Sequence, residues 1–147
     1  MKSTDKQVNA RLLKTYGITL AEYNKMLVEQ GGGCAICGRP PGTKRLHVDH
    51  DHSISKIKLD TVRSGKGWMS STEYRGGLYA MWGRGKSEAV KGLRAKLKRA
   101  SVRGILDWPC NSGLQKWRDN PNLLEKAAAY IRKFNAKEAA CVYLGNW

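Results

Sequence analysis

The sequence predicts an α+β fold in which two short strands are flanked by helices at both ends of the chain. Two segments with alternating apolar residues, 46–48 and 101–106, have the pattern of strands. Helical patterns with capping residues precede the first strand and follow the second. The 147 residues are enough for one modest domain, or for a core with a small insert.

The segment before the first strand is predicted to be helical. Residues 1–18 have the pattern of a basic helix that ends at Gly17. Thr19 and Glu22 have the spacing of a capping box, which predicts a second helix beginning after Thr19. The glycines at 31–33 are expected to end it, because glycine readily adopts the left-handed backbone of a helix exit. We therefore expect an N-terminal helical region over 1–33.

The strand pair is predicted to carry the central part of the fold. A tight knuckle over 34–38 precedes the first strand, and a helix is expected from Cys110 to about residue 118. Asn120 and Pro121 are typical of the cap and first position of a last helix. This assigns 34–52 with 101–119 to a core and 120–147 to a C-terminal helix. The Ala127–Ala129 run in that helix suits either a subunit contact or a cover for the core.

A long basic segment, 53–100, separates the two strands. Residues 67–74 and 78–82 are predicted to be strands joined by a turn, and Ser87 is expected to cap a following helix. The segment is thus predicted to be a β-β-α insert in the hairpin loop. Its helix start over 83–89 could dock a phosphate at backbone N–H groups.

The charge of the chain predicts a polyanionic partner. There are 27 Lys and Arg against 12 Asp and Glu, a net charge of +15, and the insert alone has 12 against three. Nucleic acid is the first candidate partner and a membrane surface the second, but no segment reaches the roughly 18–20 apolar residues of a spanning helix. We expect DNA contacts from eight basic side chains, the alternative being a solvated basic surface: Arg75, Arg84, Lys86, Lys91, Arg94, Lys98, Arg99 and Arg103. With no signal-peptide pattern at the N-terminus, we expect a cytoplasmic protein, in the host cell if the chain is phage-encoded.

The cysteine spacing predicts a zinc site. Cys34 and Cys37 can bind one tetrahedral zinc ion through two thiolates, and Cys110 is a candidate third ligand. Asp107, three residues before Cys110, has the spacing of a second knuckle in which a carboxylate replaces a thiolate. His47 as the fourth ligand, or a weakened site, are the alternatives. A reduced, metal-free pair or a thioredoxin-like motif would also have this spacing, but the βαβ pattern of the latter is missing.

The run Asp49-His50-Asp51-His52 predicts phosphodiester chemistry. On a continuous strand, the two aspartates face one way and the two histidines the other. His50 suits a general base, because the pKa of an imidazole lies near neutrality. Asp49 suits a hard divalent cation, and Asn111 can add an amide oxygen to the same ion. Alone, the run would also fit an acidic surface turn or a cluster of zinc ligands.

Four blocks of the sequence together resemble the phage recombination endonuclease VII family. They are residues 13–27, residues 32–38, the run Val48-Asp49-His50-Asp51-His52, and Val102-Arg103-Gly104-Ile105-Leu106 with Cys110-Asn111. The resemblance implies a ββα-metal (His-Me finger, or HNH) nuclease core with zinc knuckles. It implies Asp49 and Asn111 as ligands of a catalytic Mg²⁺ or Mn²⁺, His50 as the base and His52 as an accessory residue at the phosphate.

The resemblance also implies that the substrate is DNA, in particular branched DNA such as a four-way junction. It further implies that the protein acts as a homodimer. The chain departs from the family pattern in two places. Asp107 stands where the family has a cysteine, and the insert replaces a short turn. Two other functions fit the same residues: an HNH nicking, homing or packaging endonuclease on duplex DNA, and a zinc-knuckle DNA-binding protein without activity.

Overall fold

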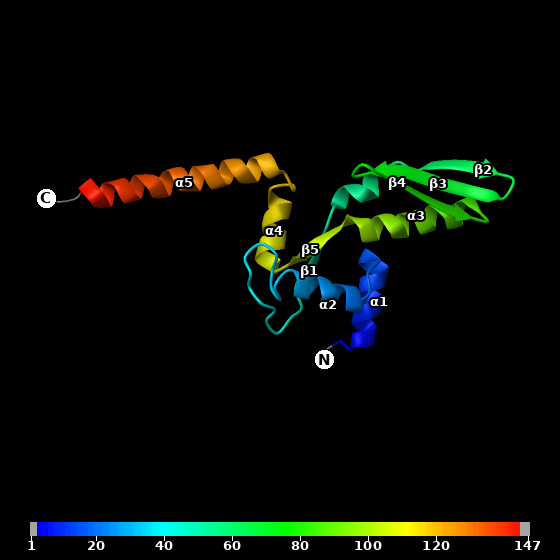
Figure 1. Cartoon of the computed structure of the whole chain (residues 1–147), viewed down its shortest axis with the longest axis horizontal. Coiled ribbons are helices and arrows are strands. Elements are labelled where there is room, and N and C mark those ends of the chain that lie inside the picture. Colours follow the sequence, from blue (N-terminus) through cyan, green and yellow to red (C-terminus); the bar gives the residue numbers. More distant parts are fainter. Residues whose placement is uncertain (1–2, 145–147) are drawn as a thin grey trace. The chain divides into compact units, whose positions relative to one another are not determined.

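The computed structural model describes residues 3–144, with side chains up to residue 133 and that of Asn135. It consists of two compact units, Met1–Asp107 and Trp108–Trp147. Helices and strands are mixed along the chain (Figure 1), which confirms the α+β class. The His-Me finger core and the domain boundaries implied by the sequence stay predictions. Within residues 3–144, no helix is both long and apolar enough to cross a membrane.

The first unit begins with two capped helices, α1 (Asp5–Tyr16) and α2 (Leu20–Glu29). The Thr19 hydroxyl accepts from the Glu22 N–H at 3.1 Å, and the Glu22 carboxylate accepts from the Thr19 N–H at 2.7 Å. Gly17 ends α1 with a φ of 73°, in the left-handed region that favours glycine. The predicted capping box and the predicted helix end are both confirmed.

The two predicted strands form an antiparallel ladder, β1 (His47–His50) with β5 (Val102–Leu106). The first strand runs two residues further than the sequence predicts, through Asp49 and His50. Asp49 pairs with Gly104 and His50 with Val102, so the register skips Arg103. This β-bulge places one extra residue of β5 opposite the chemically important end of β1.

A glutamine side chain joins α2 to this ladder. The Gln30 side-chain amide donates to the carbonyl of Ile105 at 2.7 Å and accepts from the Ile105 N–H at 3.1 Å. The Gln30 side chain therefore provides partners for the N–H and C=O of Ile105, as a third strand would. The Tyr23 hydroxyl donates to the Leu46 carbonyl at 3.0 Å and fixes the entry to β1.

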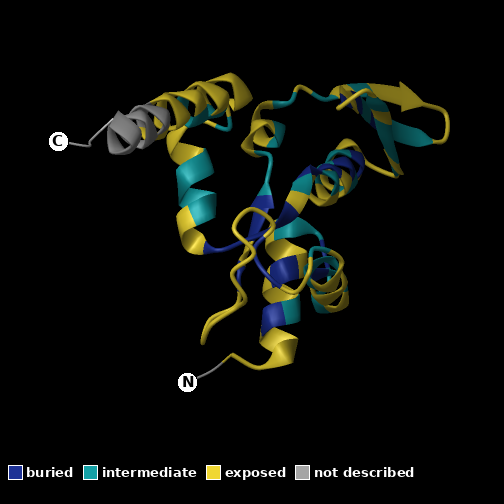
Figure 2. Cartoon of the chain, turned by 60° about the vertical axis from the view of Figure 1, so that its left-hand side comes forward, coloured by how far each residue is buried: buried dark blue, intermediate teal, exposed yellow. Residues whose placement is uncertain are grey.

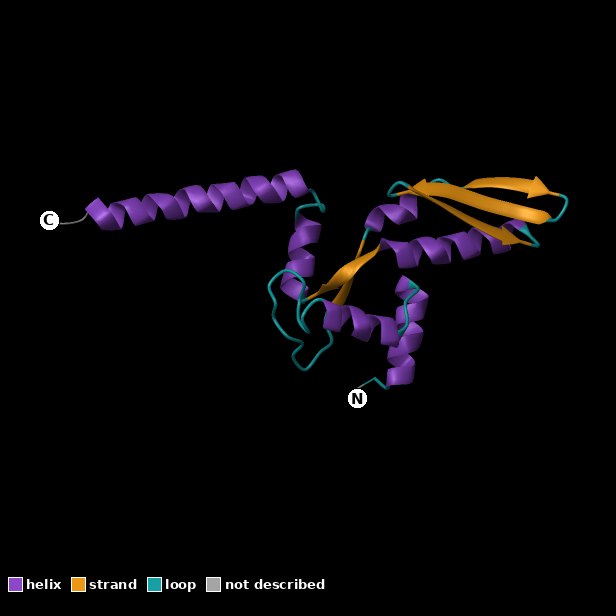
Figure 3. Cartoon of the chain, in the orientation of Figure 1, coloured by secondary structure: helices purple, strands orange, loops and turns teal. Residues whose placement is uncertain are grey.

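The insert has three strands rather than the two predicted. It consists of η1 (His52–Lys56), β2 (Asp60–Ser64), β3 (Gly67–Tyr74), β4 (Gly77–Gly83) and α3 (Lys86–Ser101). The three strands form one antiparallel sheet in chain order, and α3 lies along it (Figure 3). The sequence missed β2 because it is a largely exposed edge strand with polar residues, so it lacks apolar alternation.

The sheet and α3 enclose their own apolar core. Tyr74, Leu93 and Leu97 are buried at its centre. Six partly buried apolar side chains pack against them: Ile54, Ile57, Leu59, Tyr79, Met81 and Ala100. In Figure 2 the β1–β5 ladder is mostly dark blue, whereas the strands of the insert are mostly teal and yellow, so the first ladder is the more buried of the two.

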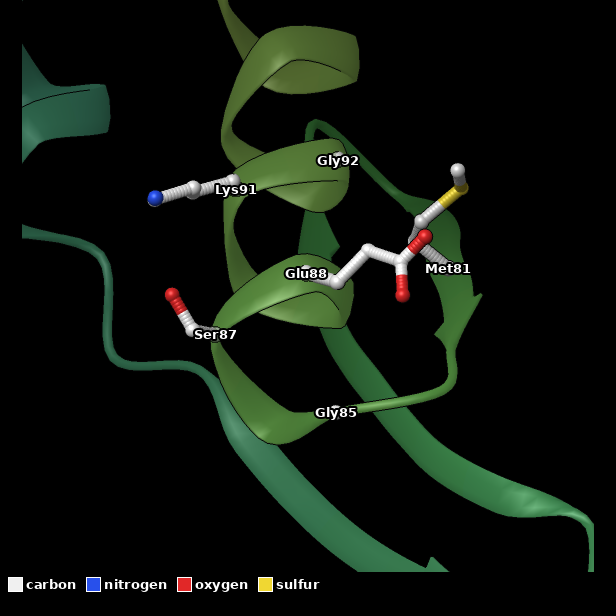
Figure 4. A pocket seen from close by; sticks show the side chains of 6 residues that line it. All are labelled: Met81, Gly85, Ser87, Glu88, Lys91 and Gly92. Carbon is white, nitrogen blue, oxygen red and sulfur yellow. The ribbon is translucent and has the colours of Figure 1, made fainter.

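The start of α3 corrects the predicted cap. Its cap is Gly85, without a side-chain cap bond, and Ser87 lies inside the first turn. The Glu88 carboxylate accepts from the Arg84 N–H at 2.8 Å. Figure 4 shows Glu88 and Ser87 at this turn, lining a shallow pocket with Met81. The bonded donor, the Arg84 N–H, precedes the cap, so a phosphate at the first-turn amides of α3 stays a prediction.

The second unit consists of α4 (Trp108–Lys116) and α5 (Pro121–Leu144). Helix α4 begins two residues before the predicted start. The Asn120 side chain accepts from the Leu123 N–H at 3.3 Å, and Pro121 is the first residue of α5. This confirms the predicted cap.

Candidate functional site

A buried carboxylate on β1 is held by an arginine from the opposite strand. Asp49 is 7 % exposed. Its two oxygens accept from Nε and Nη2 of Arg103, each at 2.8 Å. A planar guanidinium matches a carboxylate in this two-bond geometry, so Asp49 lies in a site that already accommodates positive charge.

The β-bulge explains how Arg103 reaches Asp49. On a regular strand, side chains alternate between the two faces, and a bulge redirects one of them. Because the register skips Arg103, its side chain turns toward Asp49. From the sequence, Arg103 was predicted to contact DNA, and its pairing with Asp49 was not predicted. The antiparallel register, which pairs Val48 with Ile105, was the signal that could have found it.

His50 follows Asp49 and is partly buried between aromatic rings. Its ring centroid lies 5.2 Å from that of Tyr16 and 4.3 Å from that of His52. Burial, together with the repulsion from His52, lowers the pKa of His50, although Asp49 acts in the opposite direction. The neutral imidazole is favoured, and this is the form that can accept a proton. Tyr16 is a neighbour that sequence reasoning did not identify.

The predicted alternation of the four-residue run is wrong beyond His50. The strand ends there, and Asp51 caps η1 by accepting from the Ser53 N–H at 2.8 Å. Asp51 also accepts from the Tyr74 hydroxyl at 3.0 Å, and these hydrogen bonds lower its pKa by more than burial raises it. Asp49 and Asp51 thus have separate roles, whereas the two histidines do lie together, because the chain turns at Asp51.

Asn111 lies in the first turns of α4, in the second unit. Its place beside Asp49 and His50 stays a prediction. Asp49 is chemically suited to a divalent ion, because it is an anionic oxygen donor in a site that already holds a cationic side chain.

The predicted zinc ligands gather around Asp107. The Cys34 Sγ lies 3.7 Å from Oδ1 of Asp107, and the Cys37 Sγ lies 3.3 Å from Oδ2. The turn is closed by the Gly38 N–H, which donates to the Cys34 carbonyl at 2.8 Å. Gly38 has a φ of 73°, so the predicted tight knuckle depends on a glycine at this position.

Cys110, three residues after Asp107, completes the group. The ligand atoms of Cys34, Cys37, Asp107 and Cys110 all lie within 4.8 Å of one another, and the group contains Asp107 rather than His47. Three thiol groups and one carboxylate are a donor set that zinc accepts, so these residues form a possible zinc site. Cys141 lies outside the residues whose side chains are described.

The surroundings of this group favour anionic ligands. Burial raises the pKa of Cys34, but hydrogen bonds from the backbone of Cys37, Asp107 and Ile36 lower it by more. The lowered pKa favours the thiolate, which is the form that binds a metal. Arg39 lies 3.3 Å from Oδ2 of Asp107, so a guanidinium shares this carboxylate. Sequence reasoning did not identify Arg39.

The eight predicted DNA-contacting cations divide into two groups. Five have side-chain hydrogen bonds or ion pairs within the protein. These are Arg75 with Asp51, Arg94 with the carbonyls of Ile54 and Ile57, Lys98 with the carbonyl of Lys14, Arg99 with Glu22, and Arg103 with Asp49. The other three, Arg84, Lys86 and Lys91, are exposed on the insert. A role in DNA binding stays a prediction for all eight.

Comparison with known families decides the assignment. The recombination endonuclease VII model matches residues 9–133. The chain belongs to this family. The matched residues begin within α1, include β1 and β5, and end within α5.

Individual relatives cover less of the chain. Two are the Gene 59 proteins of Mycobacterium phages D29 and L5, each 51% identical over 49 residues. That match covers 33% of this chain and 30% of each relative, so the chain matches under a third of the length of these phage proteins. No solved structure matches the chain.

Proposed function

We propose that this protein is a metal-dependent DNA endonuclease of the HNH type that hydrolyses phosphodiester bonds in branched recombination DNA. The observation that carries the proposal is the pairing of a neutral, partly buried imidazole, His50, with a buried carboxylate, Asp49, at the end of one strand. Membership of the recombination endonuclease VII family supports the same chemistry and the DNA substrate. A host cytoplasm would fit the phage relatives, and a dimer is part of the proposal.

The proposed reaction starts with proton removal by His50. The imidazole accepts a proton from a water molecule, and the resulting hydroxide attacks phosphorus. The bond from phosphorus to the 3′ oxygen breaks, and the 3′ oxygen takes up a proton from water, which leaves a 5′-phosphate and a 3′-hydroxyl. Asp49 and Asn111 would hold a Mg²⁺ or Mn²⁺ ion, whose positive charge stabilises the negative charge that develops at the phosphate. His52, whose ring centroid lies 4.3 Å from that of His50, would assist at the phosphate.

The zinc group would have a structural part in this enzyme. It joins the knuckle before β1 to the residues directly after β5. A metal bound there would hold the two strands that carry Asp49, His50 and Arg103 in register.

The test is cleavage of a labelled four-way junction with and without Mg²⁺. We expect His50→Ala to lower the cleavage rate by at least about 10²-fold, the usual contribution of a general base. His47→Ala is the matched control, because His47 is an exposed histidine on the same strand and should leave the rate unchanged. Full activity of His50→Ala with Mg²⁺ would refute the assignment. Comparison with a linear duplex of the same arms separates a junction enzyme from a nicking enzyme.

One observation favours a second function. Both oxygens of Asp49 accept hydrogen bonds from Arg103, as they would if Asp49 were only structural. The protein would then be a zinc-knuckle module that binds DNA without cutting it. Asn111→Ala separates the two functions: an enzyme loses Mg²⁺-dependent cleavage, whereas a binding module has no cleavage to lose and keeps its affinity.

A further inference from the structure

We propose that one end of the insert sheet docks the backbone of a DNA duplex about seven base pairs away from the cleaved phosphate. The sheet-end surface consists of Arg63, Lys66, Trp82, Arg84 and Lys86. The inference rests on the proposed function for its substrate, duplex DNA, and adds where and at what distance the insert holds it.

The register of the strands brings these residues to one place. Ser64 pairs with Gly67 across the β2–β3 turn, and Trp68 pairs with Gly83. The β2–β3 turn and the β4–α3 junction therefore lie at the same end of the sheet (Figures 1 and 3). A Cβ on Gly67 would lie 2.6 Å from the Gly83 carbonyl oxygen, so the two backbones approach closely.

The four cations of this surface are exposed and form no ion pair among the described residues. Arg63, Lys66, Arg84 and Lys86 are all exposed. Among the described residues, none of the four forms an ion pair with a carboxylate, whereas five other arginines do. The nearby acid, Glu88, accepts from the Arg84 backbone N–H. The surface keeps a positive excess that suits a row of phosphates.

Apolar groups lie beside the charges. Trp82 is 53% exposed and Val62 is 55% exposed, and both pair across the sheet with Met69. The Lys86 Nζ lies 5.7 Å from the centroid of the Trp68 ring. The ring beside Lys86 is that of the partly buried Trp68, and because side chains alternate along a strand, the exposed Trp82 lies on the opposite face of the sheet. The sheet end therefore presents cations with an exposed apolar side chain on one of its faces.

Helix α3 sets the distance from this surface to the proposed catalytic residues. The surface lies at the N-terminal end of α3, and Ser101 at the other end leads directly into β5, where Val102 pairs with His50. Sixteen helical residues span about 24 Å at 1.5 Å per residue. A duplex rises 3.4 Å per base pair, so the helix spans about seven base pairs.

The experiment compares four-way junctions whose arms are about 5 or about 16 base pairs long, on either side of the distance set by α3, the short arms being closed by hairpin loops. Binding is measured by fluorescence anisotropy without Mg²⁺, at several salt concentrations. Lys66→Ala/Arg84→Ala/Lys86→Ala removes three cations of the surface. Lys6→Ala/Arg11→Ala/Lys44→Ala is the matched control, because it removes one Arg and two Lys from exposed positions elsewhere.

We expect wild type and control to bind long arms at least about tenfold more tightly than short arms near 0.1 M salt. The surface variant should bind both lengths alike, and its plot of log affinity against log salt should be shallower by up to about three. Equal loss in surface variant and control, or unchanged arm dependence in the surface variant, would overturn the inference.

Cleavage by the wild type is measured in parallel on long arms with Mg²⁺. Cleavage without arm-length dependence in binding would leave the nuclease standing and refute the docking surface. Arm-length dependence that the surface variant abolishes, without any cleavage, would refute the nuclease and leave the docking surface standing.

Discussion

At the residue scale, the pair of Asp49 and Arg103 determines what β1 can do. The positive charge of Arg103 balances the negative charge of Asp49. The Asp49 side chain is 9 % exposed and that of Arg103 is 28 % exposed. Removing the arginine would leave a buried carboxylate without this partner, which is costly. We expect Arg103→Ala to lower the free energy of unfolding by about 2 kcal/mol, a value reduced for the partial exposure of Arg103.

A divalent ion should replace the lost charge. Millimolar Mg²⁺ or Mn²⁺ should raise the melting temperature of Arg103→Ala and have a smaller effect on the wild type, since ligand binding stabilises the folded state. Lys25→Ala is the control, because the exposed Lys25–Glu29 pair contributes under about 0.5 kcal/mol. Equal effects of the ion on Arg103→Ala and the wild type, in differential scanning fluorimetry, would show that Asp49 does not gain a metal when the arginine leaves.

Sequence reasoning at this scale found the chemical groups but not the partners of the acids. It correctly grouped the four residues of the possible zinc site, including Asp107, because the spacing within each pair, Cys34 with Cys37 and Asp107 with Cys110, is a local property. It failed for Asp51, because the end of a strand depends on the Tyr74 and Ser53 donors that the fold brings to it. It also missed the contact of Arg103, which depends on a bulge that no local pattern shows.

At the element scale, the capping box of α2 makes stability depend on pH. The hydrogen bond from the Thr19 N–H is the largest of the effects that lower the pKa of Glu22, and Arg99 acts in the same direction. A carboxyl with a lowered folded-state pKa stabilises the fold above its unfolded pKa, about 4.3. That contribution is lost as the pH falls through the folded-state value.

We expect Glu22→Gln to lower the free energy of unfolding by about 1 kcal/mol at neutral pH. The difference from wild type should shrink as the pH falls below about 4.3, the unfolded pKa, and vanish only below the lowered folded-state pKa, where Glu22 is protonated in both states. Urea unfolding at several pH values measures this, and Glu29→Gln, at the exposed end of the same helix, should show no such convergence. A difference that persists in acid would show that Glu22 acts through packing rather than charge.

Element prediction succeeded wherever a local chemical signal was strong. The capping residues at Thr19 and Asn120 and the strands at residues 67 and 102 were found from such signals. Strand β2 was missed because an exposed edge strand buries too little to show alternation. The N-cap of α3 is Gly85, although serine is the better capping residue and Ser87 lies nearby.

At the scale of the whole molecule, the Cys34 group connects distant parts of the sequence. Cys34 and Asp107 are 73 residues apart, with the whole insert between them. A metal bound only by the folded chain stabilises it in proportion to the logarithm of its concentration over the dissociation constant. Zinc removal by a chelator should therefore lower the melting temperature.

Asp107 is expected to determine the zinc affinity of this group. A carboxylate is a harder ligand than a thiolate. The Asp107 carboxylate also pairs with Arg39, whose Nη1 lies 3.3 Å from Oδ2 of Asp107. We expect Asp107→Cys to bind zinc at least about tenfold more tightly than wild type in competition with a chelator, and Asp107→Ala to bind it more weakly by a similar factor, the size of effect seen when metal-site residues change. Asp60→Ala, on the exposed β2, should match wild type. If Asp107→Ala kept one zinc per chain with wild-type resistance to the chelator, the ion would have to be held by the cysteines alone, and Asp107 would serve only to pair with Arg39.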